Sequence, residues 1–285
     1  MSMRKLGAYA RLMRPVNCLM MGFAVMVGAV LVRGYDGTVL GLNIVYGFVT
    51  GFTLTAASMA INDYYDRQID IINEPDRPIP SGLIQPGQAL VFALALTTIG
   101  LVSAISTTLL CFVIAVIAWM LNVTYVTIGK RSGLMGNLLV STCVAIPFVY
   151  GSAATMGAIS LNIVLFASCA FLSNTGREIT KGIVDAKGDK IKKIQTLAVR
   201  YGEKTAALVA SIFYFSAVLV SPVPWFLNLV TFWFIPLVIL TDVGLVFSSV
   251  LLLRNYSKEN AKRIKNMILV WFLIGLFGFI TGSIK

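Results

Sequence analysis

Apolar runs of about 20 residues recur along the whole chain, and each is long enough for one α-helix to cross a bilayer. We count nine such runs, and charged residues make up only 12% of the 285 residues, against about 25% in soluble domains. The sequence therefore predicts an all-α, polytopic membrane protein. The predicted spans lie near 15–33, 40–61, 88–107, 109–127, 134–155, 158–176, 205–221, 228–253 and 264–283.

Basic residues are distributed unevenly between the two sides that nine spans would define. Of the 23 Lys and Arg residues, only Arg33 and Lys285 fall on one side. Because basic loops stay in the cytoplasm, we expect a cytoplasmic N-terminus and a C-terminus outside the cell membrane. The net charge of +11 then reflects topology, with attraction to membrane lipids as a second contribution. No nucleic-acid module and no obligatory protein partner is evident.

The two longest loops on the basic side, 62–87 and 177–204, are rich in both charge signs. We expect one transmembrane domain over residues 1–285, in which nine helices surround a central cavity that opens to the cytoplasmic face. The two loops are predicted to cap an active site there.

Soft and imidazole metal ligands are scarce in this chain. Histidine is absent, and the four cysteines lie inside apolar runs without a C-x-x-C pair, which is typical of small buried side chains. A metal site would therefore use oxygen ligands, which favours a hard cation such as Mg²⁺.

Three carboxylates close the second apolar run, in "NDYYDRQID". Asp63, Asp66 and Asp70 have i, i+3 and i+7 spacing, so they form one stripe if the helix continues past the membrane surface. Asn62 lies four residues before Asp66 and can add an amide oxygen. Like charges at this spacing repel each other unless a cation lies between them. The stripe therefore indicates a metal site more strongly than a polar helix end.

A second acidic cluster closes the sixth run, in "REITKGIVDAKGD". Asp185 and Asp189 are four residues apart, and Glu178 falls on the same stripe. Lys181 lies between Glu178 and Asp185 in the sequence. Mixed charges of this kind are common in solvated loops, so the cluster is weak evidence alone.

Two carboxylate clusters on one side of the membrane suit a diphosphate bound through Mg²⁺. Basic side chains would complete the clamp. The candidates are Arg67, Arg77, Lys130, Arg131 and Lys181, although Lys130 and Arg131 are equally explained as topology determinants.

At these residues the chain resembles the UbiA superfamily of intramembrane prenyltransferases. That family carries N-D-x-x-D-x-x-x-D after its second helix, which matches residues 62–70, and D-x-x-x-D after its sixth, which matches Asp185 and Asp189. The nine predicted spans agree with the family.

Three shorter segments extend the resemblance over nearly the whole chain. They are "RPVN" at 14–17, "DRPIPSG" at 76–82 and "NVTYVTIGKR" at 122–131. The last is similar to the family's Tyr–Lys element, here Tyr125 and Lys130.

Within the family, "NEPDRPIPSG" and "REITKGIVDAKGD … IQTLAVRYG" look most like the archaeal digeranylgeranylglyceryl phosphate synthases. The resemblance implies a prenyl diphosphate donor, geranylgeranyl diphosphate. The acceptor would be a lipid-like glyceryl phosphate, through the hydroxyl of 3-O-geranylgeranylglyceryl 1-phosphate. Two Mg²⁺ ions are expected.

The residues we expect to act fall into three groups. Metal ligands are Asn62, Asp63, Asp66, Asp70, Asp185 and Asp189. The same acids, with Lys130 and Tyr125, are the expected catalytic residues. Substrate-binding residues are Asn17, Arg67, Arg77, Asn122, Arg131, Lys181 and Glu178.

Several weaker expectations concern the interior and the second loop. Asn17 is interpreted as a buried polar side chain that contacts substrate, and Asp242 inside the eighth run stays unassigned. Aromatic side chains could stabilise an allylic cation, although packing explains most of them. These are Tyr65, Trp119, Tyr125, Phe148, Tyr150 and Phe171. An acceptor phosphate could use the basic residues of the second loop, which are Lys187, Lys190, Lys192, Lys193 and Arg200.

Other functions remain open from sequence alone. An aromatic prenyltransferase would use the same metal chemistry on a ring carbon, as for 4-hydroxybenzoate. A cation-coupled transporter would place acids deeper in the spans, often in two inverted halves. A CDP-alcohol phosphotransferase would need a D-G-x-x-A-R signature, which this chain lacks.

Overall fold

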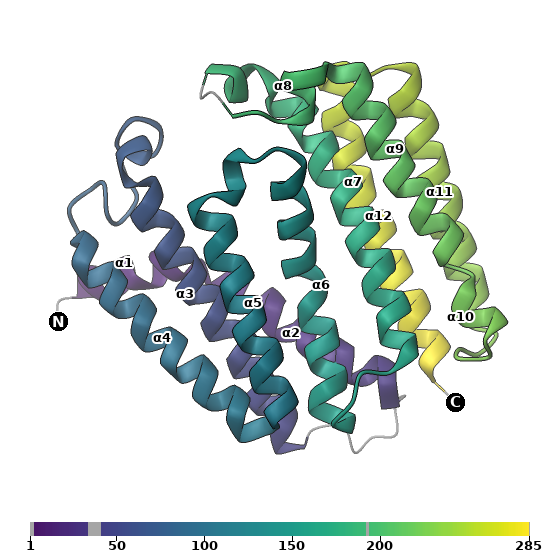
Figure 1. Cartoon of the computed structure of the whole chain (residues 1–285), viewed down its shortest axis with the longest axis horizontal. Helices are drawn as coiled ribbons and strands as arrows, with labels where there is room; N and C mark the ends of the chain where they lie inside the picture. The colour runs from purple at the N-terminus through teal and green to yellow at the C-terminus, as the bar shows by residue number, and fades with distance from the viewer. Residues whose placement is uncertain (1–2, 34–40, 192–193, 285) are drawn as a thin grey trace.

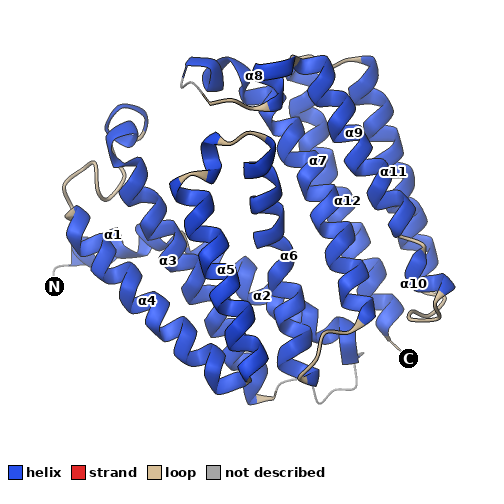
Figure 2. Cartoon of the chain, in the orientation of Figure 1, coloured by secondary structure: helices blue, strands red, loops and turns tan. Residues whose placement is uncertain are grey.

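A computed structural model describes residues 3–33, 41–191 and 194–284, and the regular elements of these residues are all helical (Figure 2). The long helices are α2 (Pro15–Arg33), α3 (Leu42–Asn73), α4 (Pro86–Thr107), α5 (Leu109–Thr127), α6 (Leu134–Met156), α7 (Leu161–Ile191), α9 (Glu203–Val220), α11 (Phe234–Arg254) and α12 (Lys258–Ser283). The short ones are α1 (Met3–Met13), the 3₁₀ turn η1 (Gly129–Arg131), α8 (Leu197–Tyr201) and α10 (Val223–Phe226).

Eight helices of the described chain are long and apolar enough to cross a membrane, whereas nine spans were predicted. The helix outside this set is α7, which covers the predicted span 158–176. Its polar side chains face inward: Asn162 is only 8% exposed and Asn174 only 6%. Asn162 donates a hydrogen bond to the Leu31 carbonyl of α2, and Asn174 donates one to the Ser141 hydroxyl of α6. Every stretch of 18 residues in α7 also contains the charged Arg177 and Glu178. The count of nine spans therefore stays a prediction.

The long helices run side by side as one bundle (Figure 1). In this view α3, α4 and α5 lie on the left, α7, α9, α11 and α12 on the right, and α2 and α6 between them. The contacts of α2 with α3 and α6, and of α6 with α7, join the two sides.

The seam between α2 and α6 is built from glycines. A Cβ atom added to Gly28 would lie 2.2 Å from the Phe148 carbonyl oxygen, and one added to Gly151 would lie 2.1 Å from that of Val25. The two backbones can approach this closely only because these residues have no side chain.

Two segments predicted as loops begin with helical residues. The predicted loop 62–87 begins with three turns of α3, and the predicted loop 177–204 begins with the end of α7. The weak break between the third and fourth spans is confirmed at Thr108, whose hydroxyl caps α5 by accepting a hydrogen bond from the Cys111 amide.

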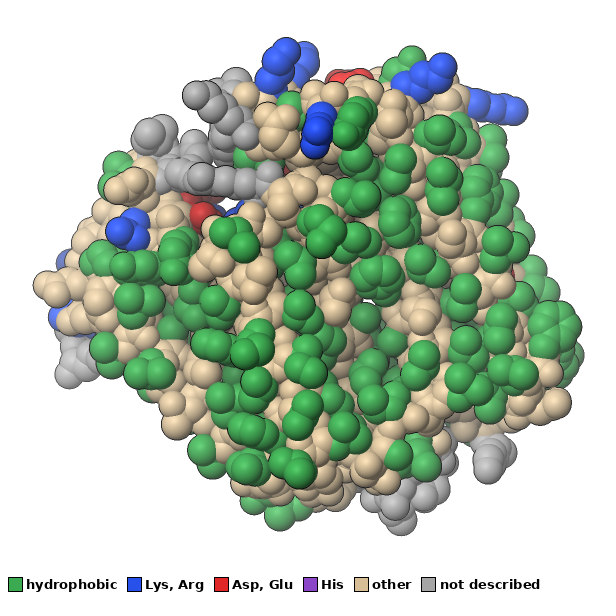
Figure 3. Space-filling view, viewed as in Figure 1, with side chains coloured by type: hydrophobic (Ala, Val, Ile, Leu, Met, Phe, Trp, Pro, Cys, Tyr) green, Lys and Arg blue, Asp and Glu red, His purple; other side chains and the backbone are tan. Residues whose placement is uncertain are grey.

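The basic N-terminal segment forms the helix α1. Ala8 and Leu12 are fully buried on its inner side, where they pack with Ala60 of α3 and Ala89 of α4. The visible face of the molecule is mostly hydrophobic, and its Lys and Arg side chains lie mainly toward the upper edge and the left side (Figure 3). We call the upper end of the bundle in Figures 1 and 3 the basic end.

Candidate active site

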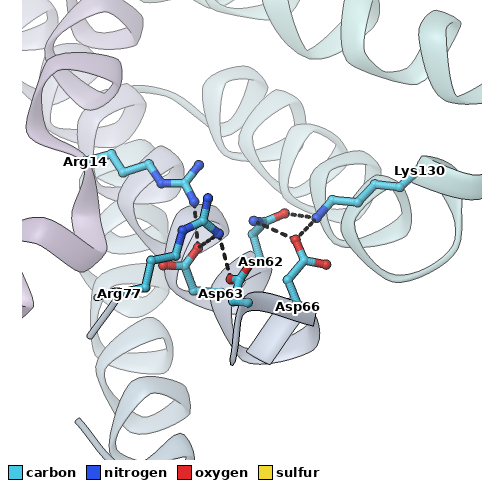
Figure 4. A network of polar contacts seen from close by, with 7 residues as sticks. Arg14, Asn62, Asp63, Asp66, Arg77 and Lys130 are labelled. Atoms are coloured by element: carbon cyan, nitrogen blue, oxygen red, sulfur yellow. Dashed lines mark hydrogen bonds and ion pairs between the residues drawn. The ribbon is translucent and has the colours of Figure 1, made fainter. Parts of the chain in front are cut away.

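The first acidic stripe lies on the last three turns of α3. Asp63 and Asp70 are buried, with exposed fractions of 2% and 5%, and Asp66 is half-buried. The three acids share one stripe of the helix, as predicted, because α3 continues without a break to Asn73. Each carboxylate contacts a basic side chain (Figure 4).

Two arginines hold the carboxylates at the two ends of the stripe. Arg14 Nη2 donates a hydrogen bond of 2.6 Å to Asp63 Oδ1. Arg77 Nη1 donates one of 2.6 Å to Asp70 Oδ2 and lies 3.7 Å from Asp63 Oδ1. Burial lowers the pKa of Arg77, but its hydrogen bond with Asp70 and the nearby acids outweigh burial and raise the pKa above its ordinary value. Arg77 therefore stays charged at any physiological pH.

Arg14 is the residue that sequence reasoning missed. It lies between α1 and α2 with a φ of 53°, a left-handed conformation that an arginine rarely adopts. It also precedes Pro15, which restricts its backbone further. The available signal was the "RPVN" match at 14–17, which marked the segment without identifying the side chain that reaches Asp63.

Lys130 approaches the stripe from the opposite side (Figure 4). Its ammonium group donates to Asp66 Oδ2 at 2.6 Å and to the amide oxygen of Asn62. Asn62 Nδ2 in turn donates to Asp66 Oδ2 at 3.2 Å. The position of Lys130 depends on Gly136, because a Cβ there would lie 2.3 Å from the Gly129 carbonyl oxygen in η1.

The second cluster lies on the end of α7, also at the basic end of the bundle (Figure 1). Glu178 pairs with Arg177 at 2.9 Å and with Lys181 at 3.5 Å. Asp185 is exposed and Asp189 is half-buried. Tyr125 lies half-buried in the last turn of α5.

Three other predicted site residues lie outside this network. Arg67 turns away from the acids: it donates to the Tyr64 carbonyl at 2.7 Å and stacks over the Tyr64 ring. Asn17 is exposed in the first turn of α2, so its interpretation as a buried side chain was wrong. Asn122 accepts a hydrogen bond from Ser58, one turn before Asn62. The side chain of Arg131, like Lys192 and Lys193, lies outside the described residues.

A cavity of about 40 Å³ adjoins α3 on the membrane side of this network. Thr50 and Leu54 of α3, Asn122 of α5 and Tyr150 of α6 are among its lining residues. Tyr150 donates a hydrogen bond to Thr50. Tyr65, another aromatic residue considered for cation stabilisation, is exposed. The site thus has an apolar interior behind its charged mouth.

The stripe fits Mg²⁺ in the kind of its donor atoms, which are three carboxylates and one amide oxygen. Its present geometry is that of ion pairs: no group of three Asp, Glu or Cys residues in the described chain could hold a metal ion as it stands. Each ion pair uses one oxygen of its carboxylate, so a bound metal would compete with Arg14, Arg77 and Lys130 for these acids. A cation whose ion pair is weakened in this way would be available to an anionic ligand.

The fold and this site define a polytopic α-helical membrane protein whose carboxylates and cations alternate at one end of the bundle. Residues 21–276 match the model of the UbiA prenyltransferase family. The chain belongs to this family and is a prenyltransferase. The cation-coupled transporter and the CDP-alcohol phosphotransferase are therefore set aside.

Similar proteins extend over the full chain. The digeranylgeranylglyceryl phosphate synthase of Archaeoglobus fulgidus is 36% identical over 99% of this chain and 98% of its own length. That of Methanosarcina mazei is 35% identical over 96% and 97%. A solved digeranylgeranylglyceryl phosphate synthase structure has a TM-score of 0.91 at 30% identity and covers 99% of this chain and 100% of its own.

A more distant structure shares the fold. It is a UbiA homolog from Archaeoglobus fulgidus bound to GPP and Mg²⁺, with a TM-score of 0.68 at 16% identity, covering 96% of this chain and 99% of its own.

Proposed function

We propose that the protein transfers a geranylgeranyl group from geranylgeranyl diphosphate to the hydroxyl of 3-O-geranylgeranylglyceryl 1-phosphate, with two Mg²⁺ ions. The observation that carries the proposal is the alternation of Asp63, Asp66 and Asp70 with Arg14, Arg77 and Lys130 at the mouth of an apolar interior. Full-length relatives that bear the digeranylgeranylglyceryl phosphate synthase name support this acceptor.

The residues of the first stripe would receive the diphosphate. Mg²⁺, when bound, would neutralise phosphate charge and stabilise the leaving diphosphate. Asp63, Asp66 and Asp70 would hold the metal in this role, with Asp185 and Asp189 for the second ion. Arg77 and Lys130 would then turn from carboxylate to phosphate oxygens, because both are charged donors.

The bond changes follow from allylic chemistry. The C1–O bond of the donor breaks, and the electron pair leaves with the diphosphate. The acceptor hydroxyl oxygen forms a new bond to C1, and its proton passes to a carboxylate or to the released diphosphate. Tyr125 is the aromatic residue that we expect to stabilise positive charge on the reacting carbon. The chain contains no histidine to serve as a base.

The deciding experiment uses purified protein in nanodiscs with Mg²⁺ and labelled geranylgeranyl diphosphate. One reaction receives geranylgeranylglyceryl phosphate and the other receives 4-hydroxybenzoate. We expect transfer to the lipid acceptor, and transfer only to the ring compound would contradict the proposal in favour of an aromatic prenyltransferase.

A matched pair of variants tests the metal site. Asp66→Asn should lower the rate by about tenfold to a hundredfold, because it removes one of the negative charges that would hold the metal. Glu259→Gln changes an acid in the first turn of α12 and should keep full activity. Equal activity of both variants would rule out the stripe as the metal site.

A further inference from the structure

A second cavity lies in the other half of the bundle. Its volume is about 340 Å³, within the range of ligand pockets, and it is lined by side chains of α2, α6, α7, α9, α11 and α12. Its walls are mainly apolar and aromatic, with Phe148, Phe166, Trp271 and Phe279 among them. It shares no lining residue with the smaller cavity beside α3.

One carboxyl group interrupts these apolar walls. Asp242 lies in the middle of α11, and its Oδ2 atom is 2.6 Å from the hydroxyl oxygen of Ser221 at the end of α9. Its Oδ1 atom is buried and has no hydrogen-bond partner among the described residues. An isolated acid of this kind inside a membrane protein is costly, which makes it a candidate functional site.

Ser221 occupies one of the two carboxyl oxygens of Asp242. Its hydroxyl donates to Asp242 Oδ2 at 2.6 Å and lies 3.0 Å from the Val218 carbonyl oxygen. Asp242 Oδ1 is then an acceptor with no hydrogen-bond donor among the described residues, beside an apolar cavity.

We propose that this cavity binds an apolar molecule that ends in a hydroxyl group, and that the hydroxyl donates its hydrogen to Asp242 Oδ1. The apolar walls select a long chain, and the single acceptor selects an alcohol over a hydrocarbon or an ether. A buried acceptor left without a donor is unfavourable, so the hydrogen bond is worth more here than at a surface. The site is separate from the acidic stripe and does not depend on the proposed reaction.

The test compares two probes that differ by one hydrogen-bond donor. Hexadecan-1-ol and its methyl ether have the same chain, but only the alcohol can donate. Native mass spectrometry of the full-length protein measures their competition. We expect the alcohol to bind about five-fold more tightly, the gain of one hydrogen bond. Equal affinity of the two probes for the wild-type protein would overturn the proposal.

Two variants locate the effect at Asp242. Asp242→Leu removes the acceptor at similar volume and should abolish the preference for the alcohol. Asp242→Asn keeps a carbonyl oxygen and should retain the preference, which also provides a folded comparison if the leucine variant is unstable. An unchanged preference in Asp242→Leu, or its loss in Asp242→Asn, would contradict the assignment.

Asp66→Asn separates this site from the active site. It should slow prenyl transfer but keep the wild-type preference for hexadecan-1-ol. Loss of the preference in Asp66→Asn would mean that the alcohol occupies the active site instead.

Discussion

Arg14 has an unfavourable backbone conformation but a favourable side-chain contact. Its left-handed φ of 53° costs on the order of 1 kcal/mol for a residue with a side chain. Its guanidinium group, however, neutralises Asp63, whose side chain is almost completely buried. The segment between α1 and α2 can keep this conformation because an unpaired buried carboxylate would cost more.

We therefore expect Arg14→Gln to lower stability by about 1–3 kcal/mol, because the buried Asp63 carboxylate then loses its 2.6 Å ion pair. Thermal unfolding in detergent measures the change. Adding Asp63→Asn in the same chain should recover most of the loss, since the pair is then neutral. A double variant no more stable than Arg14→Gln would show that the ion pair is not the cause.

At the scale of the elements, the glycine seam fixes the distance between α2 and α6. Gly151→Ala places a methyl group 2.1 Å from the Val25 carbonyl oxygen, so the helices must separate. We expect a loss of about 1–3 kcal/mol, the usual cost of overpacking.

Gly87→Ala is the matched control for the seam. Nothing lies within 4 Å of the added methyl group on α4, so the change should be neutral or slightly stabilising because alanine favours the helix. Unfolding midpoints of both variants test whether the seam tolerates an added methyl group. Equal midpoints would mean that the seam tolerates the extra volume.

The elements also show what the sequence could predict. Long apolar runs predicted most helices, because a bilayer requires about 20 apolar residues in each span. The helical spacing of Asp63, Asp66 and Asp70 likewise predicted a continuous stripe, and α3 provides it.

The contacts that the sequence did not predict were missed for physical reasons. Pairings between distant segments, such as Arg14 with Asp63 or Ser221 with Asp242, depend on how helices pack, which periodicity does not specify. Asn17 and Arg67 have the right chemistry near the site, but the described helices direct them elsewhere.

At the scale of the whole molecule, the orientation in the membrane stays a prediction from its basic residues. Lys258 begins α12 at the basic end, whereas Ala158 lies in the loop at the other end of α6, and both are exposed. We expect Ala158→Cys to react with a membrane-impermeant thiol reagent in intact cells. Lys258→Cys should react only after the cells are opened. The reverse pattern would place the N-terminus outside.

The pairing of three acids with three cations at the site has a thermodynamic consequence. A metal that binds a carboxylate weakens its ion pair with the arginine or lysine, and a diphosphate that binds the cation weakens the same ion pair from the other side. Each ligand thus prepares the site for the other, and the two affinities are linked by one coupling free energy. We expect Mg²⁺ to bind at least five-fold more tightly when inorganic diphosphate is present, after correction for Mg²⁺–diphosphate association in solution. Calorimetric titrations with and without diphosphate measure the linkage, and equal affinities would show that the ion pairs do not couple the two ligands.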